Sequence, residues 1–129
     1  MSQVRRALGM MSGTSMDGID LAVIETDGKS LIKVGTTAFR PYEEDERDLI
    51  RKALVEARRV TLRSERTPGM YAAEEAVTRV HAFLVKTALH DAGLAAGDID
   101  VIGFHGQIIF HVPDWHLTVQ LGDARACCK

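Results

Sequence analysis

The stretch "MMSGTSMDGID", from Met10 to Asp20, gathers groups that could bind phosphate and a metal ion. Two glycines, three hydroxyl side chains and two aspartates stand between two apolar runs. Glycine lets a backbone approach a ligand closely, backbone N–H and hydroxyl groups donate to phosphate oxygens, and a carboxylate can hold Mg²⁺ directly or through its waters. The stretch therefore has the outline of a nucleotide phosphate site.

Two common phosphate loops do not fit this stretch. A Walker loop ends in Gly-Lys-Ser/Thr and enters a helix, whereas Gly18 is followed by Ile19 and then by a strand pattern. The glycines at positions 9, 13 and 18 also lack the spacing of the dinucleotide fingerprint. A strand-turn-strand hairpin remains, and its tip carries Ser12, Thr14, Ser15 and Asp17. An ordinary turn stays open as the alternative, because Gly, Ser and Asp are common in turns.

Three apolar runs should form the strands that hold this hairpin. They are "RRALGMM", "IDLAVIETDG" and "LIKVGTTAFRPY", joined by short turns, and they predict an antiparallel meander. In the second run Ile19, Leu21 and Val23 fall on one face while Ala22 and Ile24 fall on the other. Apolar residues on both faces predict a central strand.

Two helices and further strands should follow. Apolar residues recur at helical spacing from Glu43 to Arg59, with acids in the first turns. A second helix is predicted from about Tyr71 to Asp91, ended by Gly93. Its buried stripe is expected to consist of Val77, Val80, Leu84 and Ala88. "DIDVIGF" then returns to a strand, and a hairpin is expected around Pro113 and Asp114.

The five histidines raise the question of a metal site. His105 and His111 would lie roughly 20 Å apart on an extended strand, and His111 and His116 have opposite parity, so the spacing argues against zinc unless the chain bends at Gly106. His81 and His90, on the second helix, are expected to face solvent.

Composition limits the remaining possibilities. A chain of 129 residues that is 46% hydrophobic is long enough for one domain with a core. A net charge of −2 predicts no nucleic-acid partner, and without a long apolar segment we expect no membrane partner and a cytoplasmic location. Cys127 and Cys128 are adjacent, so they cannot join distant elements, as is typical of a reducing compartment.

Three ordered motifs together carry a family resemblance. "GMMSGTSMDGID" at residues 9–20 resembles the N-terminal signature of the anhydro-N-acetylmuramic acid kinases. "GFHGQIIFHVP" at 103–113 is similar to that family's His-Gly-Gln-Thr segment, and "TVQLGD" at 118–123 to the segment that follows it. The motifs span nearly the whole chain, so chance similarity is a poor explanation.

The resemblance implies a fold and a reaction. The fold would be α/β, a ribonuclease-H-like lobe of the sugar kinase, Hsp70 and actin type, with a mixed sheet and flanking helices. The reaction would be ATP-dependent phosphorylation of 1,6-anhydro-N-acetylmuramic acid, with water added across the anhydro bond, giving N-acetylmuramic acid 6-phosphate for peptidoglycan recycling. The expected partners are therefore ATP, Mg²⁺ and a small amino sugar.

The resemblance also implies which residues bind these ligands. The ATP phosphate segment would comprise Gly13, Thr14, Ser15, Met16, Asp17, Gly18, Ile19 and Asp20. Asp17 is the candidate for organising magnesium, whereas Asp20 lies past the tip of the hairpin and could as easily cap the strand. His105 and Gln107 suit hydrogen bonding to the sugar, with a structural role as the alternative.

Some positions depart from the family pattern. Ile108 replaces a usual threonine and Val112 a usual arginine, which puts sugar affinity in question. The family's general base and adenosine-binding segments would lie beyond Lys129, so no catalytic residue is expected within the chain. We expect residues 1–129 to be the N-terminal portion of an incomplete first lobe, with the second lobe absent, and hence an inactive truncated fragment that tends to self-associate. The alternatives are a non-catalytic nucleotide- or sugar-binding module and a poorly folded gene remnant.

Overall fold

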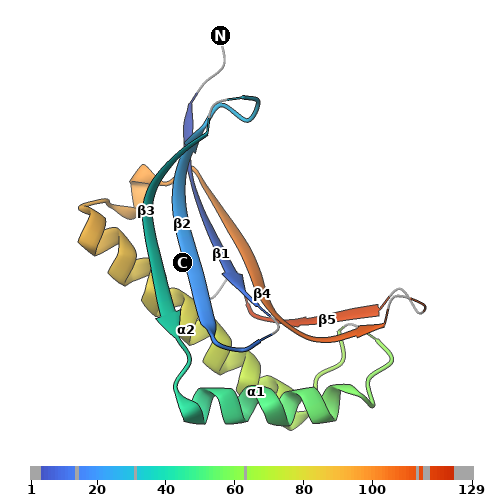
Figure 1. Cartoon of the computed structure of the whole chain (residues 1–129). Helices are drawn as coiled ribbons and strands as arrows, with labels where there is room; N and C mark the ends of the chain where they lie inside the picture. The colour runs from blue at the N-terminus through green and yellow to red at the C-terminus, as the bar shows by residue number, and fades with distance from the viewer. Residues whose placement is uncertain are drawn as a thin grey trace.

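A computed structural model describes residues 4–13, 15–30, 32–62, 64–112, 114 and 117–123. The elements in chain order are β1 (Arg5–Ser12), β2 (Gly18–Thr26), β3 (Ile32–Pro41), α1 (Glu44–Ala57), α2 (Pro68–Ala92), a short 3₁₀ helix (Ala96–Asp98), β4 (Val101–Val112) and β5 (Leu117–Leu121). Figure 1 shows the strands as one curved sheet, with α2 running along it and α1 crossing at one end.

The sheet has five strands in the order β3-β2-β1-β4-β5. β1, β2 and β3 pair antiparallel, so the predicted meander is confirmed, and β2 lies in the interior of the sheet as its apolar faces indicated. β4 lies parallel to β1, and β5 returns antiparallel to β4 at the sheet edge. This is a mixed α/β fold, consistent with an incomplete lobe of the sugar kinase and actin type.

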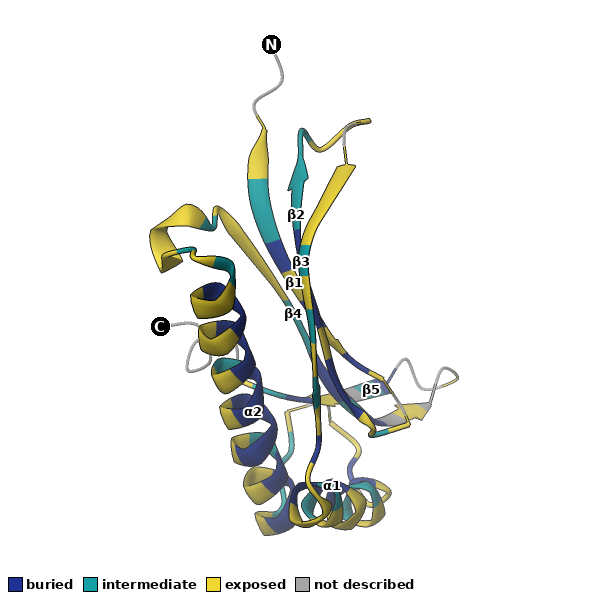
Figure 2. Ribbon diagram, turned by 60° about the vertical axis from the view of Figure 1, so that its left-hand side comes forward, coloured by how far each residue is buried: buried dark blue, intermediate teal, exposed yellow. Residues whose placement is uncertain are grey.

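One face of the sheet is covered and the other is open. Figure 2 shows that the buried side of α2 faces the sheet. The core contains fully buried residues from the sheet and both helices, among them Leu8, Ile19, Ile50, Met70 and Val77. Within the described residues no helix covers the opposite face, where Met11, Phe39 and Val101 each expose more than half of their surface.

The helices form where their periodicity predicted, with one change of boundary. α2 begins at Pro68 rather than near Tyr71, because the Thr67 hydroxyl accepts a hydrogen bond from the Met70 N–H and Pro68 suits the first helical turn. Its end at Gly93, with φ 70°, is as predicted. The expected stripe of Val77, Val80, Leu84 and Ala88 is buried. Among the described residues no helix is long and apolar enough to cross a membrane.

The prediction that His81 faces solvent is wrong. His81 is fully buried, its Nδ1 lies 2.7 Å from the Val77 carbonyl oxygen, and its ring centroid is 4.7 Å from that of Phe104. The position follows Val77 by four residues, so it belongs to the buried stripe of α2. His90 is exposed, as predicted.

The last strands form the expected hairpin. β4 is longer than "DIDVIGF" indicated, because it continues through His105 and His111 until Val112 pairs with Leu117 of β5. Of the residues discussed above, Thr14, Pro113, His116, Cys127 and Cys128 lie outside the described residues.

Candidate functional site

The loop between β1 and β2 comprises residues 13–17 and lies at the end of the sheet where α1 crosses (Figure 1). The Met16 N–H donates to the Gly13 carbonyl at 3.2 Å, which closes a tight turn. Met16 has φ 60°, a left-handed conformation that is uncommon outside glycine. Ser15 and Asp17 are exposed, so a hydroxyl and a carboxylate stand on a defined turn.

Arg47 of α1 holds the second half of this loop. Its Nε donates to the Met16 carbonyl at 3.2 Å and its Nη2 lies 3.4 Å from the Asp17 carbonyl. The Tyr42 N–H donates to the same Asp17 carbonyl at 2.9 Å. The guanidinium group therefore places a positive charge beside the loop. Sequence reasoning missed Arg47, because it looks like any other charge on the polar face of α1.

An ion pair fixes the start of α1 and so helps to place Arg47. Arg40 of β3 contacts the buried Glu46 at 2.6 Å, and the Glu43 N–H donates to the same carboxylate at 2.7 Å. Burial by itself raises the pKa of Glu46, but the hydrogen bonds and the charge of Arg40 outweigh it and hold the pKa below its ordinary value. Glu46 therefore stays ionised at neutral pH.

Gln107 of β4 holds the first half of the loop. Its Nε2 donates to the Gly13 carbonyl at 3.1 Å, and the side chain is 1% exposed. His105, two residues earlier, is half-buried, and its Nδ1 lies 3.1 Å from the Gly106 carbonyl. The structure thus brings Gln107 to the predicted loop, whereas the hydrogen bond of the His105 ring is to its neighbour on β4.

The two motif glycines have different surroundings. A side chain at Gly18 would meet β3, with the Pro41 Cα at 2.7 Å, a Phe39 ring carbon at 2.8 Å and the Arg40 carbonyl oxygen closer still. Among the described residues, a side chain at Gly13 would meet only the Ser15 hydroxyl oxygen, at 3.8 Å. Gly18 therefore serves strand packing, while Gly13 leaves open space above the turn.

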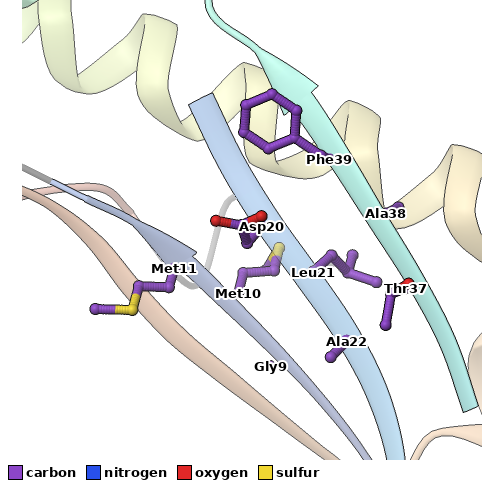
Figure 3. Close-up of a pocket in the computed structure, with 9 residues that line it drawn as sticks. All are labelled: Gly9, Met10, Met11, Asp20, Leu21, Ala22, Thr37, Ala38 and Phe39. Carbon is purple, nitrogen blue, oxygen red and sulfur yellow. The ribbon is translucent and has the colours of Figure 1, made fainter. Parts of the chain in front are cut away.

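The two motif aspartates also separate. Asp17 stands on the loop, whereas Asp20 of β2 lies on the open face of the sheet. Figure 3 shows Asp20 among Met11, Ala22, Thr37 and Phe39, which help to line a shallow pocket of about 680 Å³. This pocket is apolar apart from Asp20 and Thr37 and is built on the sheet rather than on the loop.

Asp17 could share a magnesium ion with a nucleotide. Mg²⁺ keeps several waters and is commonly held by one or two carboxylates together with substrate phosphates. The single exposed carboxylate of Asp17 on this loop fits that donor set. In the described part of the chain no three His, Cys, Asp or Glu side chains gather into a metal-binding group.

Comparison with known proteins agrees with the three motifs. The family model described as anhydro-N-acetylmuramic acid kinase matches residues 5–129. Proteins of that name from Nitrobacter winogradskyi and Agrobacterium fabrum are 50% and 49% identical over 123 residues, which is 95% of this chain. One from Rhodopseudomonas palustris is 46% identical over the same length. The chain spans about a third of the length of these relatives, 34%, 33% and 34% respectively. Because the family model matches nearly all of its residues, the chain belongs to the anhydro-N-acetylmuramic acid kinase family.

Proposed function

We propose that the loop at residues 13–17 binds the phosphates of ATP, with Mg²⁺, for phosphorylation of 1,6-anhydro-N-acetylmuramic acid. The reaction would couple hydrolytic opening of the anhydro bond to transfer of a phosphoryl group to the sugar 6-oxygen. Its product would enter peptidoglycan recycling in the cytoplasm. The single observation that carries this proposal is that an exposed hydroxyl and carboxylate stand on a turn held from both sides, by Gln107 and Arg47.

The loop supports phosphate binding through position and charge. Phosphoryl transfer depends mainly on holding the phosphates in line and neutralising their charge. The open space at Gly13 lets phosphate oxygens approach the backbone, and the Arg47 guanidinium favours negative charge beside the loop. Asp17 is the residue that would hold Mg²⁺, and the ion would supply positive charge against the phosphates.

His105 and Gln107 differ as candidates for sugar recognition. His105 is half-buried on the strand that also carries Gln107, so it remains our candidate for a hydrogen bond to the sugar. Both Gln107 amide hydrogens already face backbone carbonyls, those of Gly13 and Ile108, so a sugar contact there would have to replace one of these hydrogen bonds.

Calorimetric titration of the 129-residue chain with ATP, with and without Mg²⁺, tests this proposal. We expect binding that requires Mg²⁺ and that Asp17→Asn weakens by about tenfold or more, equivalent to about 1.4 kcal/mol. Asp20→Asn is the matched control, because it removes another exposed motif carboxylate, from the open sheet face, and it should leave the affinity unchanged. Binding that is insensitive to Mg²⁺, or that is lost in Asp20→Asn and retained in Asp17→Asn, would refute the assignment.

A further inference from the structure

Three polar side chains are buried directly beneath the loop. They are Ser12 at the end of β1, Tyr42 just after β3 and Gln107 in β4, with 2%, 3% and 1% exposure. They come from three separate parts of the chain. Buried polar groups destabilise a fold unless they are hydrogen-bonded, so the partners of these three groups matter.

The three side chains form one connected set of hydrogen bonds. The Ser12 hydroxyl donates to Gln107 Oε1, which leaves the Tyr42 hydroxyl, 3.0 Å away, to donate to Ser12 Oγ. Gln107 Nε2 then donates to the carbonyls of Gly13 at 3.1 Å and Ile108 at 3.2 Å. Burial raises the pKa of Tyr42, so the phenol keeps the proton that this direction requires.

A bulge in β4 places Gln107 in this set. Met10 pairs with Phe104, but Ser12 pairs with Gln107, so β4 contains one extra residue at this point. Gly106 has φ 75°, and a side chain there would strike the Leu121 carbonyl. Without the extra residue Gly106 would stand opposite Ser12, and no side chain would reach the loop from β4.

The Gly13 carbonyl is the point at which this set meets the loop. It accepts both from Gln107 Nε2 and from the Met16 N–H that closes the turn. We propose that Gln107, oriented by Ser12 and Tyr42, is a positioning residue that fixes the turn for the phosphates of Mg²⁺-ATP. This inference rests on the proposed function of the loop. It means that Gln107 would act on nucleotide binding by holding the Gly13 carbonyl of the loop, and not by touching the nucleotide itself.

Gln107→Met tests the proposal, since it keeps the length of the side chain but removes both amide groups. Two quantities are measured on the 129-residue chain, the hydrogen-exchange rate of the Met16 amide and the dissociation constant for Mg²⁺-ATP. Loss of a net hydrogen bond worth about 1 kcal/mol should raise each by about fivefold. Gln120→Met is the matched control, because the Gln120 amide donates at 2.9 Å to the His105 carbonyl, outside the loop, and it should change neither.

Two further variants keep the test decisive if Gln107→Met folds poorly. Tyr42→Phe removes only the far end of the set and should raise both quantities by a smaller factor. Gln107→Glu loses the donor to Gly13 when ionised but regains one donor when protonated, and burial raises the pKa of such a carboxyl. Its affinity relative to the original chain should therefore recover as pH is lowered from 8 to 5.5, compared at pH values at which the variant is folded, so that the recovery does not reflect refolding.

The outcomes separate this inference from the function on which it rests. Faster Met16 exchange with unchanged Mg²⁺-ATP affinity would overturn the positioning role while leaving the loop as the phosphate site. Unchanged Met16 exchange in a folded Gln107→Met chain would show that Gln107 does not hold the turn, and would overturn the positioning role. Absence of Mg²⁺-ATP binding by the unsubstituted chain would instead refute the proposed function, and the positioning role with it.

Discussion

Arg47 of α1 and Met16 of the β1–β2 loop are joined by a hydrogen bond of 3.2 Å from the guanidinium Nε to the backbone carbonyl. The two residues are 31 positions apart in the chain. Through this bond α1, which follows the three-stranded meander, holds the turn between the first two strands of that meander. The same guanidinium also brings a positive charge to that turn, at 3.4 Å from the Asp17 carbonyl.

Replacing Arg47 should impair the loop more than the fold. In Arg47→Gln we expect the affinity for Mg²⁺-ATP to fall by about 3- to 10-fold, because a charge-assisted contact and the hold on Met16 are both lost. Arg51→Gln, one turn further along α1, removes only exposed pairs with Glu44 and Asp48 and should have little effect. Parallel calorimetric titrations check this, and equal losses in the two variants would contradict it.

The two motif glycines should respond oppositely to alanine. Gly18→Ala should lower the free energy of unfolding by about 1–3 kcal/mol, because the added carbon meets the β3 backbone. Gly13→Ala should change it by less than about 0.5 kcal/mol yet weaken Mg²⁺-ATP binding, because the new methyl group enters the space above the turn. Urea unfolding and titration of both variants separate the effects. A stable Gly18→Ala chain would show that β3 can move aside.

Burial of His81 should make stability depend on pH. Burial lowers the pKa of its imidazole, and the hydrogen bond with the Val77 carbonyl offsets this only in part. The folded chain therefore binds fewer protons than the unfolded chain as pH falls below about 6.5. The stability that comes from keeping His81 neutral is therefore fully present above about pH 6.5 and is lost as pH falls below it. The free energy of unfolding should fall by at most about 1.4 kcal/mol per pH unit.

Urea unfolding at pH 7.5, 6.5 and 5.5 measures this dependence. His81→Gln should reduce the slope between pH 6.5 and 5.5, whatever it does to stability at neutral pH. His90→Gln, on the exposed end of the same helix, should retain the slope. If His90→Gln flattened the profile and His81→Gln did not, the buried imidazole would not be the source.

The parts of the fold that could be predicted are those set by local sequence pattern. The alternation in "IDLAVIETDG" predicted a strand of the meander, and the stripe from Val77 to Ala88 predicted the second helix. Each pattern indicates which side of a single element is apolar. The burial of His81 could also have been predicted, since it continues that stripe. Polarity alone is a poor guide to exposure when the ring has a backbone partner and an aromatic neighbour.

The candidate site could be predicted only in part, because its supports are distant in sequence. The motif located the loop, but nothing near Arg47 indicates that it reaches Met16, and the bond from Gln107 to Gly13 spans 94 residues. The β4 bulge that makes this bond possible depends on the parallel pairing with β1, which local periodicity does not encode. The different roles of Gly13 and Gly18 likewise appear only once β3 is in place.

The most direct test of the central claim is to locate the metal-nucleotide complex on the chain. In an amide NMR spectrum, Mn²⁺-ATP should selectively broaden the signals of the loop, residues 13–17, and of Arg47, and Mg²⁺-ATP should shift the same signals without broadening them. Asp17→Asn should remove both effects. Broadening centred instead on the open sheet face, at Asp20, Thr37 and Phe39, would contradict the assignment of the loop as the phosphate site.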